Sequence, residues 1–104
     1  MTQSPFQYRH GDVLIAPVAA LPAGAVPRTG LVLAHGEHTG HSHRIRESGA
    51  ASLYVYGKEL YLLVSAPTAT VVHEEHRPIE LPVGVYRVWQ QREYTPSAIR
   101  TVVD

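Results

Sequence analysis

LYVYGKELYLLV, residues 53–64, contains two runs of apolar and aromatic residues on either side of Gly57 and Lys58. Such runs are typical of strands, and a two-residue connection containing glycine is typical of a tight hairpin. This stretch therefore predicts two antiparallel strands that pair with each other.

The same pattern extends outward through the rest of the chain. Short runs of Val, Leu, Ile and Tyr are separated by Gly and Pro at close spacing, which favours strands over helices. Turns are expected at residues 21–24, 66–67 and 81–84, where a proline fixes φ. The predicted strands are 11–18, 30–35, 41–46, 51–56, 60–65, 69–75 and 84–94.

About seven strands predict an all-β fold, a small barrel or a sandwich. After the last strand, residues 95–100 begin with a capping threonine followed by Pro96, which predicts a short C-terminal helical turn. A chain of 104 residues has the size of one domain, so we expect a single β-barrel domain over residues 1–104.

Composition excludes several classes of function. Nine Lys and Arg residues balance nine Asp and Glu residues, so we expect no nucleic-acid partner and no anionic membrane partner. The absence of cysteine excludes disulfides, thiolate metal sites and cysteine nucleophiles. Without a signal-like start or an apolar run of membrane-spanning length, the sequence predicts a cytoplasmic protein.

Histidine is the distinctive residue of this chain, and six of the seven histidines fall in two short stretches. In the first stretch, His41 and His43 lie on the predicted strand 41–46, so their side chains project from the same face. Two neutral imidazoles at that spacing are suitable ligands for a divalent transition metal such as Zn, Fe, Ni or Mn. His10 and His35 are expected to be surface residues or hydrogen-bonded core residues, and His38 a solvated loop residue.

The second stretch, His73-Glu74-Glu75-His76, differs from the helical zinc-protease motif because its histidines are three residues apart rather than four. On a continuous strand His73 and His76 would face opposite sides. His73 is therefore the preferred third metal ligand, and His76 is a rival that a turn before Pro78 would bring in. Glu75 or Glu74 is a candidate fourth ligand or general base.

The first histidine stretch resembles a known family. The pattern Gly36-x4-His41-x-His43-x3-Glu47 is similar to the first metal motif of cupins, which are small β-barrels. The resemblance implies a cupin-like fold with one divalent metal held by the His-x-His pair, and it adds Glu47 as a metal ligand.

The second cupin motif is similar to Pro82-Val83-Gly84, but Arg87 stands where that family has its last histidine ligand. The resemblance therefore leaves the fourth ligand unassigned. It also makes Arg87 a candidate catalytic residue that faces the same cavity and could hold a carboxylate substrate.

The whole chain also resembles a small bacterial family with no established activity. The shared phrases are His10-Gly11-Asp12-Val13-Leu14, Gly36-Glu37, Thr39-Gly40-His41, His43 and His73-Glu74-Glu75-His76. This resemblance favours His41, His43, His73 and His76 as the metal ligands over His35 and His38, and it implies no reaction.

Two classes of function follow from these features. The first is a metal-dependent enzyme of the oxygenase, isomerase or hydrolase type that acts on a small-molecule ligand, with Glu75, Glu74 and Arg87 as candidate catalytic residues. The second is a non-catalytic binding or assembly module, with a structural metal or a pH-sensitive histidine patch. Aromatic residues on the predicted strands suit packing or a homo-oligomer interface, and these are Tyr54, Tyr56, Tyr61, Tyr86, Trp89 and Tyr94.

Overall fold

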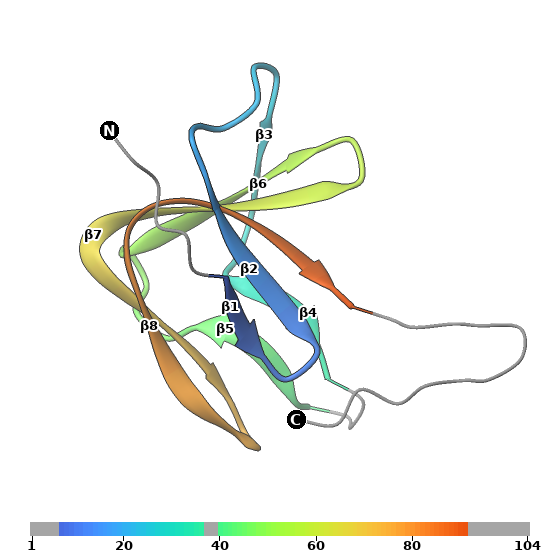
Figure 1. The fold of residues 1–104 in the computed structure, drawn as a ribbon, viewed down its shortest axis with the longest axis vertical. Coiled ribbons are helices and arrows are strands. Elements are labelled where there is room, and N and C mark those ends of the chain that lie inside the picture. Colours follow the sequence, from blue (N-terminus) through green and yellow to red (C-terminus); the bar gives the residue numbers. More distant parts are fainter. Residues whose placement is uncertain (1–6, 37–39, 92–104) are drawn as a thin grey trace, which may run out of the picture.

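A computed structural model of the chain describes residues 7–36 and 40–91, and it confirms the all-β prediction for them. The sheet curls into a half-barrel (Figure 1). The predicted C-terminal helical turn and Tyr94 lie outside the described residues. The strands are β1 (Tyr8–His10), β2 (Val13–Val18), β3 (Val26–Arg28), β4 (Val32–His35), β5 (Ser42–Ile45), β6 (Ala51–Tyr56), β7 (Glu59–His73) and β8 (His76–Gln90).

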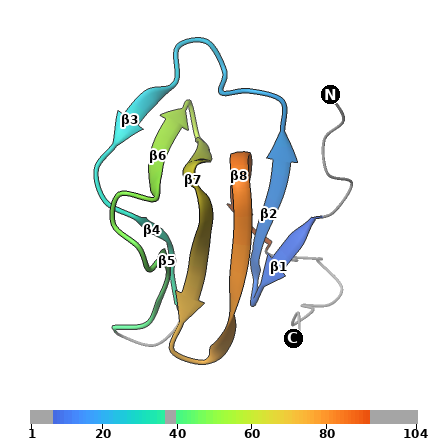
Figure 2. The ribbon, with the colours of Figure 1, turned by 90° about the vertical axis from the view of Figure 1, so that its left-hand side faces the viewer.

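All pairings in the sheet are antiparallel, and the two long strands β7 and β8 form its centre. The hydrogen-bonded order is β1-β2-β8-β7-β5-β4, and β6 pairs with both β3 and β7. The first part of β7 pairs with β6, and its last part pairs with β5. Figure 2 shows β2, β8 and β7 side by side, with the shorter strands continuing the curl beyond β7.

The hairpin predicted from residues 53–64 is confirmed. Tyr56 pairs with Glu59, which leaves Gly57 and Lys58 as the two-residue connection. Gly57 has a φ of 62°, a left-handed conformation that side-chain-bearing residues rarely adopt. The predicted turn at residues 21–24 is also present, because the N–H of Ala25 donates to the Pro22 carbonyl at 3.1 Å.

The turns predicted at residues 66–67 and 81–84 are wrong, because β7 and β8 run through them. The pairing passes from Val64↔Gly84 to Thr68↔Pro82, so three residues of β7 bulge opposite a single residue of β8. A bulge leaves residues outside the regular ladder, and a proline fits there because it has no N–H to donate. The sequence also did not predict the short strands β1 and β3.

The core lies on the inner face of the curled sheet. Its fully buried large side chains include Ile15, Leu53, Leu62, Leu81, Val13, Val64 and Val71. Two of the aromatic residues, Tyr61 and Tyr86, are also buried, as expected for packing residues. Within the described part of the chain, no helix has the length and apolar character that crossing a bilayer requires.

Candidate metal centre

Four strands bring histidine side chains together at one end of the half-barrel. His10 is the last residue of β1, His43 lies in β5, His73 ends β7 and His76 begins β8. His73 and His76 are cross-strand partners, because the chain turns between them. The structure therefore contains the turn before Pro78 that allows both histidines to face the same side.

Three of these residues form the inner triad, which we define as His43, His73 and His76. One potential ligand atom from each lies within 4.8 Å of the others. The rings of His43 and His73 are 4.3 Å apart between centroids, and those of His73 and His76 are 4.7 Å apart. His43 is 2% exposed, so the triad reaches from the buried interior to the half-buried surface.

A second set of potential ligands, the outer group, comprises His41, His73 and Glu74. The His41 ring lies 5.7 Å from that of His73 and nearly perpendicular to it. Glu74 accepts hydrogen bonds from the Ser42 N–H at 3.2 Å and the Arg44 guanidinium at 3.1 Å. The two histidines of the His-x-His pair thus both approach His73, but they belong to different sets.

Burial favours the uncharged form of two members of the inner triad, His43 and His73. Desolvation, followed by the neighbouring rings of His73 and His10, lowers the pKa of His43 to about 4, although Asp12 acts in the opposite direction. Desolvation also lowers the pKa of His73, followed by the effect of His76. A neutral imidazole has one nitrogen lone pair, which is the form that binds a metal.

The turn between β1 and β2 closes over the triad. Gly11 is buried with a φ of 63°, and a Cβ atom there would lie 2.8 Å from Nε2 of His76 and 3.0 Å from Cε1 of His43. Only a glycine allows the backbone to approach the two rings this closely. Beside it, Oδ1 of Asp12 lies 3.6 Å from Nε2 of His43, and Oδ2 of Asp12 accepts a hydrogen bond from Gln90 at 3.0 Å.

His10 is buried and contacts His43 of the inner triad. The sequence did not predict this contact. Of the two roles expected for His10, a surface residue or a hydrogen-bonded core residue, the structure shows the second, with bonds to His43 and to the Arg77 carbonyl. The available signal was the phrase His10-Gly11-Asp12, which places a histidine next to a glycine. His35 is exposed on β4, and His38 lies outside the described residues.

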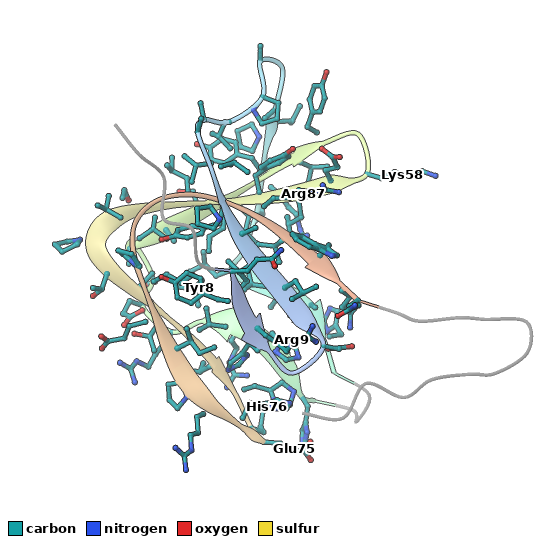
Figure 3. The ribbon with its side chains drawn as sticks, in the orientation of Figure 1. Tyr8, Arg9, Lys58, Glu75, His76 and Arg87 are labelled. Atoms are coloured by element: carbon teal, nitrogen blue, oxygen red, sulfur yellow. The ribbon has the colours of Figure 1, made fainter. Side chains whose placement is uncertain are left out.

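Glu74 and Glu75 form the turn between β7 and β8, and Figure 3 shows Glu75 next to His76. The backbone N–H of Glu75 donates to Nδ1 of His73 at 2.9 Å. The Glu75 carboxylate lies 3.6 Å from Nδ1 of His41. The pKa of Glu74 is held below its usual value by a hydrogen bond from the backbone N–H of Glu74 itself, by the Ser42 N–H and by the charge of Arg44. Glu74 is therefore a carboxylate at neutral pH.

The structure does not bring Glu47 or Arg87 together with the histidines. Glu47 accepts hydrogen bonds from the backbone N–H of Thr70 at 2.8 Å and from the Thr70 hydroxyl at 2.6 Å. Arg87 pairs with Glu59 at 3.4 Å and lies over the Trp89 ring. Figure 3 shows Arg87 near Lys58, well away from Glu75 and His76.

Comparisons with known proteins show a family but no function. No curated protein and no solved structure matches the chain, so the cupin resemblance gains no support from them. One family model, described as a domain of unknown function, DUF8820, matches residues 9–91 and so spans β2 to β8 and the whole inner triad. The chain therefore belongs to the DUF8820 family.

Proposed function

We propose that the protein binds one divalent transition-metal ion through the inner triad of His43, His73 and His76. The observation that supports this most strongly is the convergence of three imidazole nitrogens, from β5, β7 and β8, within 4.8 Å. Nitrogen ligands around a tetrahedral zinc lie about 3.3 Å apart, given bonds of about 2.0–2.1 Å. Small rotations of the three rings would bring the nitrogens to that spacing.

The donor set favours particular metals. Imidazole suits Zn, Fe and Ni, whereas Mn prefers carboxylates and water. Glu74 is within reach of His73 in the outer group, so it offers the carboxylate that a harder ion would require. Because the inner triad consists of imidazoles alone, we expect it to bind Zn, Ni and Fe more tightly than Mn.

Three protein ligands leave coordination positions for water or a small molecule, as metal centres that act on substrates require. The proposed function is thus metal-dependent binding or conversion of a small molecule at the end of the half-barrel. Hydrolase, isomerase and oxygenase chemistry are each compatible with three neutral nitrogen ligands. Glu74 and Glu75, in the adjoining turn, are the candidate acid–base residues, because they are the carboxylates nearest to His73 along the chain.

Elemental analysis tests the proposal. The full chain, purified without an affinity tag or a chelator, is compared with His43→Ala, His76→Ala and the matched control His35→Ala. His35 is exposed on β4 and belongs to neither ligand set. We expect about one equivalent of metal in the wild type and in His35→Ala, and a loss of metal from the two triad variants.

Three results would overturn the proposal. The first is a wild-type protein that takes up no Zn, Fe, Ni or Mn on addition. The second is a triad variant that binds metal as the wild type does. The third is equal loss of metal from His35→Ala. A triad variant that loses its metal and unfolds would instead support the non-catalytic alternative, in which the metal is structural.

A further inference from the structure

His10 links the backbone carbonyl of Arg77 to His43 of the inner triad through two hydrogen bonds. It is 2% exposed, and its Nε2 lies 2.9 Å from the backbone carbonyl oxygen of Arg77. Its Nδ1 lies 2.9 Å from Nδ1 of His43. Both distances are typical of direct hydrogen bonds. Which ring nitrogens of His10 and His43 carry protons follows from which atoms in these two hydrogen bonds can donate.

A carbonyl oxygen can only accept, so Nε2 of His10 must carry the proton that it shares with Arg77. A neutral imidazole carries one proton, and burial disfavours a charged ring. Nδ1 of His10 is therefore an acceptor. The hydrogen bond between the two rings then requires His43 to donate from its own Nδ1, which leaves Nε2 of His43 without a proton.

We propose that His10 is a positioning residue that fixes His43 as its Nδ1–H tautomer, so that Nε2 of His43 keeps its lone pair for a metal. This inference rests on the proposed metal site and names the ligand atom that His43 contributes. Residues that hold the second nitrogen of a ligand histidine in this way set both its tautomer and its ring orientation.

The distance to Asp12 agrees with this assignment. Its Oδ1 faces Nε2 of His43 at 3.6 Å, which is longer than an N–H···O hydrogen bond. Its other carboxylate oxygen is held by the Gln90 amide. With the lone pair of Nε2 on one side and an anionic oxygen on the other, the space between them is electrostatically suited to a cation.

The tautomer can be measured directly in the metal-free wild-type protein by long-range ¹H–¹⁵N correlation of the imidazole rings. We expect His43 to show a protonated Nδ1 and an unprotonated Nε2. The opposite tautomer, or a mixture of the two, would overturn the inference. Because this experiment requires no metal, the expected tautomer in a protein that binds no metal would overturn only the proposed function.

Two variants of His10 separate positioning from mere packing. His10→Ala removes the acceptor for His43, whereas His10→Asn places an amide oxygen near the position of Nδ1. We expect His10→Ala to weaken Zn²⁺ binding by about 10- to 100-fold, measured by competition with a chromophoric chelator. We expect His10→Asn to restore most of the affinity, and His35→Ala to leave it unchanged.

A His10→Ala variant that binds Zn²⁺ as tightly as the wild type would contradict the positioning role. So would a His10→Asn variant that remains folded, by circular dichroism, and is as weak as His10→Ala. If His10→Ala fails to fold, the wild-type tautomer and the His10→Asn affinity still decide the question.

Discussion

Gly11 combines a left-handed backbone with close contact to His76 and His43 of the inner triad, so its replacement has two separable effects. In Gly11→Ala the backbone strain costs about 1–2 kcal/mol of folding free energy. The added Cβ would also lie 2.8 Å from Nε2 of His76, so the inner triad must shift. We expect Gly11→Ala to lose both stability and Zn²⁺ affinity, measured by urea unfolding and chelator competition.

Gly57 provides the matched control. Its φ of 62° is nearly that of Gly11, and a Cβ there would meet nothing within 4 Å. Gly57→Ala should lose stability by a similar amount and keep the wild-type affinity for Zn²⁺. Equal affinity in the two variants would show that Gly11 has no special relation to the site.

Glu47 gives the fold a predictable dependence on acid. Hydrogen bonds from the Thr70 hydroxyl and backbone N–H lower its pKa below 4.5. The charged carboxylate therefore stabilises the fold above that value, and this contribution is lost as the pH falls through the lower pKa of the folded state. We expect the difference in unfolding free energy between wild type and Glu47→Gln to shrink between about pH 6 and pH 3.

Comparing two variants at each pH cancels most of the effect of histidine protonation, which both proteins share. In a Thr70→Val background the effect of Glu47→Gln should be smaller at neutral pH, because the hydroxyl is the largest cause of the shift. A difference between wild type and Glu47→Gln that does not change with pH would contradict this account.

At the level of elements, the β7–β8 turn is expected to respond to the metal. The N–H of Glu75 occupies the lone pair of His73 at Nδ1, and a neutral ring has only one. A metal on Nδ1 would displace that N–H, and a metal on Nε2 would place a proton on Nδ1. Either way, we expect Zn²⁺ to release the Glu75 amide, which shifts its ¹H–¹⁵N resonance and speeds its hydrogen exchange.

The amide of Lys58, in the other tight hairpin turn, should not respond. His76→Ala, which removes a proposed ligand, should abolish the change at Glu75. If the wild-type protein binds Zn²⁺ and the Glu75 amide remains protected, then His73 is not a ligand of the bound ion.

The same turn explains how far the sequence could predict the site. The sequence predicted His41, His43, His73 and His76 as metal ligands, with His73 preferred over His76. The relation between His73 and His76 depends on where a strand ends. On a continuous strand they would face opposite sides, and across a turn they face the same side. Nothing in the letters HEEH distinguishes the two cases, because the difference lies in the pairing of β7 with β8.

At two prolines the sequence predicted a turn where the structure has a continuous strand. Pro67 and Pro82 suggested turns, yet both lie within long strands. At the bulge of β7 the N–H groups of Ser65 and Ala66 both donate to the Ala50 carbonyl, at 3.0 and 3.1 Å. The bulge is thus held by Ala50, the residue just before β6, rather than by the regular ladder with β8. Such a tertiary contact cannot be inferred from the local preference of proline.

On the scale of the whole molecule, the aliphatic core and the inner triad occupy different regions. The buried aliphatic side chains lie on the inner face of the curled sheet. Figure 3 shows His76 at one end of the molecule, and His43 and His73 are grouped with it. We therefore expect the metal-free protein to remain folded after chelation, with an unchanged far-UV circular dichroism spectrum. Metal at 100 times its Kd should then add about 2.7 kcal/mol of stability and raise the Tm.

Unfolding on chelation would contradict this separation and identify the metal as structural. An unchanged Tm across a metal titration would show that the folded state binds no metal. The His43→Ala variant, whose Tm should not rise with added metal, distinguishes binding at the triad from binding elsewhere on the surface.

The hydrogen bond between His10 and the Arg77 carbonyl also has a consequence for when the site can form during synthesis of the chain. The two residues are 67 positions apart, on the first and the last strands that the structure describes. Contacts over such a separation form late, because the intervening loop must close first. On the ribosome, the complete histidine cluster cannot form until His76 and Arg77, at the start of β8, have emerged. A metal held by the inner triad would therefore mark a chain that has been made at least as far as β8.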